Sequence, residues 1–352
     1  MKTIDLEKLV RPNILRLKPY SSARKEFSGE GRIFLDANEN SFGSPTSVPL
    51  NRYPDPLQLD VKEAFSRIVG LRSGQMFLGN GSDEAIDLIL RILCEPRTDN
   101  IIICPPTYGM YEVSAEINDI EIRRVPLNSD FQLNVPAILD AVDSKTKLIF
   151  ICSPNNPTGN AMRREDVISL LESFEGIVIV DEAYIHFSSQ ESFVPSLSRY
   201  QNLMVLQTFS KAWGLAGLRV GVAFADERII EMMNRIKPPY NLSTVAQEII
   251  IEALENQNEV KVLVGEILKE RERMRKILET IHCVEKVFDT DANFLLVRVN
   301  DADRIYKWLL EDAIIVRNRN TVELCEGCIR ITVGTRDENE ALVESMRRFV
   351  SQ

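Results

Sequence analysis

Histidine is scarce in this chain of 352 residues, which contains only His186 and His282. Two histidines supply too few ligands for a zinc site, and the lone CEGC motif at 325–328 does not make up the number. We therefore expect no metal centre, and we expect Cys325 and Cys328 to lie at a strand edge.

Dense clusters of lysine and arginine are also missing, and the net charge is −10. A chain of this charge is a poor partner for nucleic acids or anionic membrane surfaces. The start of the chain, MKTIDLEKLV, contains acidic residues and no long apolar stretch, unlike a signal peptide. No apolar run is long enough to cross a bilayer. We expect a cytoplasmic protein with reduced cysteines.

Two common catalytic motifs are absent from the sequence. There is no P-loop to cradle a nucleotide phosphate, and no GxSxG elbow to present a nucleophilic serine. The composition is that of an ordinary soluble enzyme, with 44% hydrophobic and 27% charged residues. The length is sufficient for two domains with well-filled cores.

Between residues 76 and 224, short apolar runs alternate with helical patterns. The runs predict strands at 76–78, 101–103, 121–125, 147–152, 177–180, 203–207 and 220–224, and a further strand at 33–35. Such alternation predicts an α/β fold with an open, mostly parallel sheet covered by helices on both faces. Ligands collect at the carboxyl ends of the strands in such sheets.

The chain divides into three predicted parts. Residues 1–30 are mixed in pattern and are expected to form an arm, and residues 31–238 form a large domain. Residues 239–352 form a small α/β domain that begins near a Pro-Pro pair and includes a long connecting helix at 259–281. Its predicted strands are 294–299, 314–316 and 329–333.

The stretch TFSKAWGLAGLRVG at 208–221 organises the site prediction. Lys211 lies among small and apolar residues, where loss of hydration lowers the pKa of an amine and makes it a usable nucleophile and base. The Thr208 and Ser210 hydroxyls and the Arg219 guanidinium are suited to holding a phosphate. A lysine beside a phosphate site indicates pyridoxal phosphate. A helix N-terminus with a lysine extended towards water explains this stretch equally well.

Four further features allow two interpretations each. The GNGSD motif at 79–83 suits an anion site or a plain helix cap, and Asp181 suits a protonated pyridine nitrogen or a structural salt bridge. The amide of Asn156, in a loop rich in proline, suits a hydrogen bond to a ring oxygen or a simple turn. Tyr108 suits stacking on a ring or packing in the core.

These residues together resemble the fold-type I pyridoxal-phosphate aminotransferases. The resemblance rests on NPTG at 156–159, DEAY at 181–184, SK at 210–211 and Arg219, and it extends over nearly the whole chain. It narrows to the histidinol-phosphate aminotransferase branch through PYSSAR at 19–24, DANEN at 36–40, RYPDP at 52–56, GNGSDE at 79–84, PPTY at 105–108, LAGLR at 215–219 and CIRITVG at 328–334. The implied fold has a large domain with a mostly parallel seven-stranded sheet and a smaller C-terminal α/β domain.

The resemblance also implies roles for individual residues. Lys211 bonds the cofactor covalently and later moves the proton, Asp181 pairs with the pyridine nitrogen, and Tyr184 and Asn156 bond the ring oxygen. The other cofactor-binding residues implied are Ser82, Asp83, Tyr108, Thr208, Ser210, Arg219 and, from the neighbouring subunit, Tyr53. The implied substrate-binding residues are Arg330, Arg317, Tyr20 and Asn156. A homodimer with shared active sites follows from the role of Tyr53.

The expected reaction converts L-histidinol phosphate and 2-oxoglutarate to imidazole-acetol phosphate and glutamate in histidine biosynthesis. An arginine fork can bind both substrates, because carboxylates and phosphates each accept bidentate hydrogen bonds. An aromatic aminotransferase or a threonine-phosphate decarboxylase shares most of these motifs. A ligand-sensing regulator is a more distant alternative, since such proteins carry a DNA-binding module for which we find no helix-turn-helix pattern.

Overall fold

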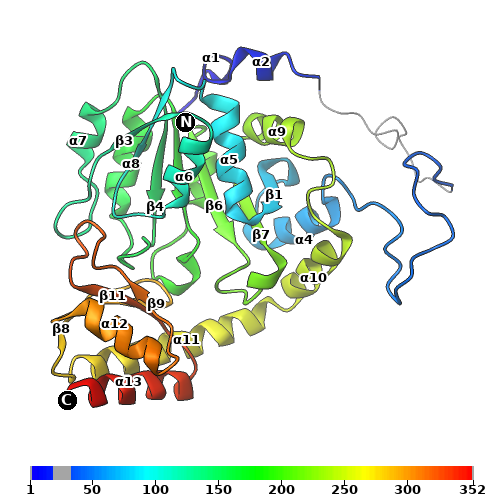
Figure 1. Cartoon of the computed structure of the whole chain (residues 1–352). Coiled ribbons are helices and arrows are strands. Elements are labelled where there is room, and N and C mark those ends of the chain that lie inside the picture. The colour runs from blue at the N-terminus through cyan, green and yellow to red at the C-terminus, as the bar shows by residue number, and fades with distance from the viewer. Residues whose placement is uncertain (1, 19–32, 351–352) are drawn as a thin grey trace.

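A seven-stranded sheet forms the centre of the computed structural model, which describes residues 2–18 and 33–350 (Figure 1). The strand order is β1-β7-β6-β5-β4-β2-β3, and only β7 runs antiparallel to its neighbours. The bounds are β1 Met76–Asn80, β2 Asn100–Ile103, β3 Glu121–Arg124, β4 Thr146–Cys152, β5 Ile177–Asp181, β6 Leu203–Thr208 and β7 Val220–Phe224. The predicted α/β fold with a mostly parallel sheet is confirmed.

Both faces of this sheet are buried because successive side chains alternate between them. In β4, Ile149 and Ile151 pack on one face, and Leu148 and Phe150 pack on the other. The first face is covered by α4 Leu59–Val69, α7 Val135–Asp140, α8 Arg164–Ser173 and α10 Thr244–Glu255. The second is covered by α1 Leu6–Leu9, α5 Gly81–Leu93, α6 Met110–Ile117 and α9 Glu227–Ile236. The short helix α2 Pro12–Leu15 follows α1.

A four-stranded antiparallel sheet, ordered β10-β11-β9-β8, forms the smaller C-terminal domain. Its strands are β8 Val284–Val287, β9 Phe294–Val299, β10 Arg317–Asn318 and β11 Cys328–Thr332. On one face, Ile329 and Ile331 pack against α11 Gln257–Leu278, α12 Ala302–Glu311 and α13 Arg336–Val350. On the opposite face, Leu296 and Cys328 join the core of the large domain. The small sheet therefore presents one face to the large domain.

Two strand predictions are wrong. No strand forms at 33–35, where the residues Ile33 and Leu35 are 68% and 84% exposed. This apolar run has no neighbouring strand to pair with, and the segment stands away from the body of the molecule in Figure 1. The strand predicted at 314–316 begins later, as β10 at Arg317. Helices α7 and α9 and strand β8 were not predicted from the pattern.

No helix in the described part of the chain is long and apolar enough to span a membrane.

Candidate active site

A cavity of about 690 Å³ opens at the carboxyl ends of the parallel strands and extends to the small sheet. The segments that line it follow β1, β2, β4, β5 and β6 in the large domain and include β10 and β11 in the small one. The lining residues predicted from the sequence are Ser82, Asp83, Tyr108, Asn156, Asp181, Tyr184, Thr208, Ser210, Lys211, Arg219, Arg317 and Arg330. The fold thus brings twelve of the fourteen predicted residues together.

Asp181 ends β5 and is the most buried charged residue that lines this cavity. Its side chain is buried, and it accepts hydrogen bonds from the Tyr111 hydroxyl at 2.7 Å and the Ala183 backbone N–H at 3.1 Å. Burial raises the pKa of Asp181 to about 6, although both hydrogen bonds oppose that rise. Because both donors are neutral groups, the carboxylate is suited to pairing with a cationic ligand atom.

Lys211 follows β6 and is exposed to the cavity. Its Nζ lies 5.7 Å from the centroid of the Tyr184 ring, which is itself buried against Phe294. Burial, and then the positive charges of Arg330 and Arg219, lower the pKa of Lys211. The amine is therefore easier to deprotonate than a lysine on the surface.

The first turn of α5 and the 208–221 loop meet backbone to backbone. A Cβ at Gly221 would lie 2.3 Å from the Ser82 nitrogen, so only glycine permits this approach. Gly81, at φ +73°, donates its N–H to the Arg219 carbonyl at 2.6 Å, and Arg219 has a φ of +56°. The contact brings the Arg219 guanidinium to the N-terminus of α5, where helix amides favour an anion.

Hydroxyl and carboxylate groups surround the Arg219 guanidinium and hold it in place. Arg219 donates to the Ser210 hydroxyl at 3.4 Å and lies 3.6 Å from the Asp83 carboxylate. The Tyr108 hydroxyl donates to the other Asp83 oxygen at 3.0 Å. The Thr208 hydroxyl accepts the Ser210 N–H at 3.1 Å. Serine, threonine and arginine donors therefore gather around one end of the cavity.

Three arginines form the wall that the small domain contributes, namely Arg317, Arg319 and Arg330. Arg317 pairs with Arg330 across β10 and β11. The Arg330 guanidinium donates to the Asn156 side-chain oxygen and lies 5.1 Å from the Phe294 ring centroid. We refer to these three residues as the arginine wall.

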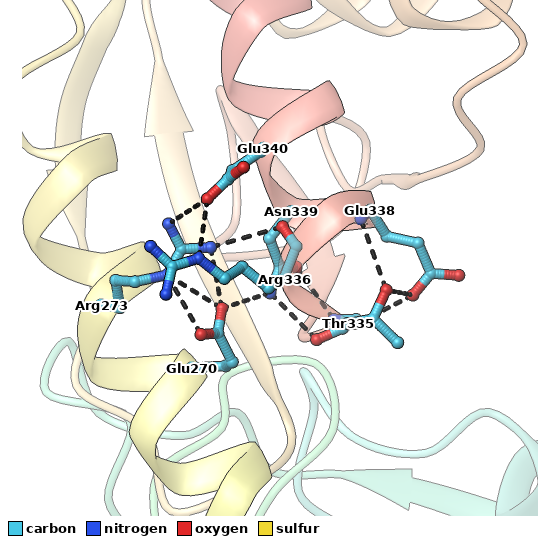
Figure 2. A network of polar contacts seen from close by, with 8 residues as sticks. Glu270, Arg273, Thr335, Arg336, Glu338, Asn339 and Glu340 are labelled. Carbon is cyan, nitrogen blue, oxygen red and sulfur yellow. Dashed lines mark hydrogen bonds and ion pairs between the residues drawn. The ribbon is translucent and has the colours of Figure 1, made fainter.

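Polar contacts at the end of β11 anchor this wall to the helices of the small domain (Figure 2). The buried Asn339 side chain accepts the Gly334 N–H and donates to the Gly334 carbonyl, each at 2.9 Å, and it also donates to Glu270 at 3.1 Å. Glu270 in turn forms an ion pair with Arg273 on α11. The strand that carries Arg330 is thus held at its end by α11 and α13.

Comparison with known proteins identifies the family. The sequence profile of the family described as "Aminotransferase class I and II" matches residues 36–346. The chain belongs to the class I and II aminotransferase family. The histidinol-phosphate aminotransferase of Cytophaga hutchinsonii is 52% identical to it, over 98% of this chain and 99% of that protein. The one from Bacteroides fragilis is 50% identical, over 99% and 100%. These relatives confirm the resemblance found in the sequence.

Solved structures share the fold. The histidinol-phosphate aminotransferase from Clostridium acetobutylicum has a TM-score of 0.79 at 24% identity, covering 86% of this chain and 91% of that one. The enzyme from Sinorhizobium meliloti, in complex with pyridoxal-5'-phosphate, has a TM-score of 0.79 at 23% identity, covering 90% and 89%. The fold-type I architecture predicted from the sequence is confirmed.

The protein is an enzyme of a family that depends on pyridoxal phosphate, and the cavity fits this cofactor. The buried Asp181 carboxylate, bonded only to neutral donors in the described structure, suits a protonated pyridine nitrogen. The N-terminus of α5, Ser210 and Arg219 suit a phosphate. Lys211 lines the same cavity as these two groups.

One predicted site residue in the described part of the chain, Tyr53, does not line this cavity. Tyr53 stacks on Tyr240, with ring centroids 4.5 Å apart, and lines a separate pocket with Asn38 and Ser243. Its role in a neighbouring subunit stays a prediction. Tyr20 lies outside the described residues.

Sequence reasoning missed Tyr111 and Arg319. Tyr111 is buried and contacts Asp181, and its ring stacks on Phe150 with centroids 4.8 Å apart. Its position one helical turn after Tyr108 is the only signal in the sequence that could have indicated it. Arg319 lies two residues after Arg317, the spacing of neighbours on one face of a strand. This spacing could have indicated that Arg319 shares a face with Arg317.

Proposed function

We propose that this protein transfers the amino group of L-histidinol phosphate to 2-oxoglutarate, giving imidazole-acetol phosphate and glutamate in histidine biosynthesis. The observation that carries the proposal is the arginine wall, which faces the same cavity as Lys211 and Asp181. Each substrate carries an anionic group and, near it, the carbon that bears the amino or keto group. The arginine wall can bind the anionic group, and Lys211 can act as the base at that carbon. Relatives about half identical in sequence have the name of this activity.

Lys211 is the proposed base of the reaction. When bound, the cofactor supplies an electron sink beside the substrate carbon that loses its proton. The Lys211 Nζ takes the proton from that carbon, holds it, and gives it back in a later step. Its lowered pKa supports this role, since a base must be partly unprotonated near neutral pH.

Asp181 is proposed to hold the pyridine nitrogen in its protonated form, and its burial strengthens that ion pair. Tyr184 and Asn156 are proposed to bond the ring oxygen, and Tyr108 to stack on the ring. The proposed phosphate ligands are the backbone at Ser82 and Asp83, together with Thr208, Ser210 and Arg219. The meeting of α5 with the 208–221 loop supports this last group.

Arg330 is the proposed shared fork for both substrates. It is half-buried, and its hydrogen bond to Asn156 holds the guanidinium towards the cavity. A held guanidinium offers two parallel N–H donors, which match either a carboxylate or a phosphate. Arg317, directly opposite on β10, is proposed to add a second cation for the substrate anion, with Tyr20 beside it.

Turnover of competing substrates tests the proposed function. The purified enzyme should be assayed side by side with histidinol phosphate, phenylalanine and threonine phosphate, with 2-oxoglutarate as acceptor where one is needed. We expect histidinol phosphate to have the highest kcat/KM. A preference for phenylalanine would indicate an aromatic aminotransferase, and release of carbon dioxide from threonine phosphate would indicate a decarboxylase. Binding without turnover of any of the three would favour a ligand sensor.

A homodimer with shared active sites is part of the proposal. The projecting segment before α4 exposes Ile33, Leu35 and Phe42, an apolar surface that a second copy of the chain can cover (Figure 1). Tyr53 lies on the same segment, in a loop stiffened by neighbouring prolines, and is half exposed. We propose that it reaches the cofactor phosphate of the partner subunit.

Mixing two inactive variants tests this sharing. Tyr53→Glu places a negative charge against the cofactor phosphate, and Lys211→Ala removes the base. If Tyr53 acts across the interface, a hybrid dimer has one site with both changes and one site with neither, so activity returns after subunit exchange. If Tyr53 acts within its own chain, each site carries one change and the mixture stays inactive. Proven exchange without recovery would rule out the shared site.

The proposed compartment is the cytoplasm. All six cysteines are buried and unpaired, which suits a reducing environment.

A further inference from the structure

Arg319 continues the ladder between β10 and β11 beyond the last residue of β10. Its backbone N–H donates to the Cys328 carbonyl at 2.9 Å, next to the pairing of Arg317 with Arg330. Residues two apart on a strand share one face, so Arg319 lies on the same side as Arg317. Arg330 is its diagonal neighbour across the ladder, at a separation of about 7–8 Å between backbones. All three side chains line the cavity.

Two of these guanidinium groups are incompletely satisfied. The Nε atoms of Arg319 and Arg330 are buried and have no hydrogen-bond partner in the described part of the chain. A buried N–H without a partner is costly, and more so when the group is charged. The Nε atoms themselves are not accessible, but incompletely paired buried charge behind a cavity wall favours an anionic ligand beside these guanidinium groups.

The charged and titratable neighbours of Arg319 do not neutralise it. The groups that act on it most strongly are the guanidinium of Arg317, the thiol of Cys325 and the phenol of Tyr184. The strongest influences on Arg330 are Tyr184, Arg319 and Arg317. None of these is a carboxylate. Burial, followed by like charge, lowers the pKa of both arginines, which fits a wall whose strongest neighbours within residues 2–18 and 33–350 supply no carboxylate.

We infer that Arg319 is a specificity-determining residue that favours a phosphate monoester over a carboxylate at the arginine wall. A carboxylate brings one charge and two oxygens, which the fork of Arg330 can satisfy alone. A phosphate monoester brings close to two charges near neutral pH and three acceptor oxygens. The second charge and the third oxygen require a further cationic donor, and Arg319 is placed to provide it. This inference rests on the proposed function, in which one substrate is a phosphate ester and the other a dicarboxylate.

The test compares inorganic phosphate with glutarate as ligands of the cofactor-loaded enzyme, measured by isothermal titration calorimetry. Loaded enzyme is used because the cofactor then occupies its own phosphate site. We expect Arg319→Gln to weaken phosphate binding about 10- to 100-fold, the effect of losing a charge-assisted hydrogen bond, while glutarate binding changes less than about threefold. Arg319→Lys, which keeps the charge, should recover part of the phosphate affinity.

Arg298→Gln is the matched control. Arg298 lies on β9 opposite Cys328, and its guanidinium packs over the Phe288 ring at 5.3 Å, away from the cavity lining. Its removal should leave both affinities unchanged. The inference would be overturned if Arg319→Gln weakened phosphate and glutarate equally, or weakened neither. Retained cofactor absorbance in Arg319→Gln shows that the variant is folded, and Arg319→Lys provides the comparison if it is not.

Turnover separates this inference from the proposed function. If the wild type does not convert histidinol phosphate, yet Arg319→Gln loses phosphate selectivity, the proposed substrate is wrong and the role of Arg319 stands for another phosphate monoester. If the wild type and Arg319→Gln convert histidinol phosphate with equal kcat/KM, the role of Arg319 is wrong and the proposed function stands.

Discussion

The cavity has a floor, formed by the large-domain residues Asp83, Asp181, Lys211 and Arg219, and it has the arginine wall. These two regions differ in how their charges are balanced. On the floor, Asp181 accepts two hydrogen bonds, and Arg219 lies near the Asp83 carboxylate. On the arginine wall, the neighbours that act most strongly on Arg319 and Arg330 include no carboxylate. The floor is held by the large domain and prepared for a permanent group, whereas the wall is left cationic for an anion that arrives and departs.

The floor carries the groups proposed for the chemical steps, and the wall carries the groups proposed to bind the substrate. The floor groups follow strands of the parallel sheet, whose carboxyl ends converge at one edge. The wall comes from two short antiparallel strands of the small domain, where register alone sets which side chains face the cavity. Substitutions on the floor should therefore stop the chemistry for every substrate, and substitutions on the wall should change affinity by substrate.

Lys211→Ala should have the largest effect. We expect turnover to fall by about 10⁴-fold for both half-reactions, which is the upper end of what a positioned base contributes. Single-turnover kinetics with histidinol phosphate and with glutamate, at equal cofactor loading, provide the measurement. If one half-reaction kept normal rates, Lys211 would not be the common base.

Arg330→Leu tests the wall. Removing one partner of a buried charge pair costs roughly 2–5 kcal/mol, so kcat/KM should fall for both substrates. Arg330→Lys keeps the charge without the fork and should retain part of the activity if bidentate bonding matters. A loss confined to one substrate would show that the fork is not shared.

Asp181→Asn tests the floor in a milder way than Lys211→Ala. A neutral amide cannot keep the pyridine nitrogen protonated, so proton removal should slow about 10²–10³-fold while the cofactor stays bound. The cofactor content from absorbance, set beside the rate of proton removal from a deuterated substrate, separates the two effects. Near-normal turnover would mean that Asp181 is structural.

The pH dependence of stability gives an independent check on Asp181. Its pKa is about 6 in the fold, against 3.8 as the ordinary value, so the folded cofactor-free protein binds the extra proton. Stability should then fall as pH rises from about 4 to about 6, by ~3 kcal/mol relative to Asp181→Asn. Urea unfolding of both cofactor-free proteins at several pH values measures this difference. A difference that does not change with pH would contradict the raised pKa.

Tyr111→Phe should have the smallest effect and would sharpen the description of the floor. The Tyr111 hydroxyl donates to Asp181 and favours its ionised form, so its loss should raise the pKa of Asp181. We expect the acidic limb of the kcat/KM profile to move to higher pH and activity to fall about tenfold, as for one hydrogen bond to a charged group. Tyr200→Phe, which removes a distant hydroxyl bonded to Glu172, is the control and should leave the profile in place.

Much of the large domain could be predicted from the sequence, because most of its strands are short apolar runs buried on both faces, whereas the edge strand β3 is partly exposed. The small domain was harder to predict. Strand β8 shows exposed glutamate and lysine side chains between two valines, and β10 has only two residues. Strands like these are held by their neighbours and leave little pattern in the sequence. The apolar run at 33–35 was predicted as a strand but does not form one, because an apolar pattern alone does not supply a strand to pair with.

The sequence by itself determined the family and most of the cavity floor. Motifs such as DEAY at 181–184 place their polar groups directly after buried strands, and parallel strands deliver those groups to one edge. Only the tertiary structure decided that Tyr111 contacts Asp181 and that Arg319 stands beside Arg330 on the wall. The physical reason is that Tyr111 and Asp181 lie 70 residues apart in the chain, and that Arg319 faces Arg330 only through the pairing of its segment with β11. Strand register and helix packing fix their geometry, and neither is written in the local pattern.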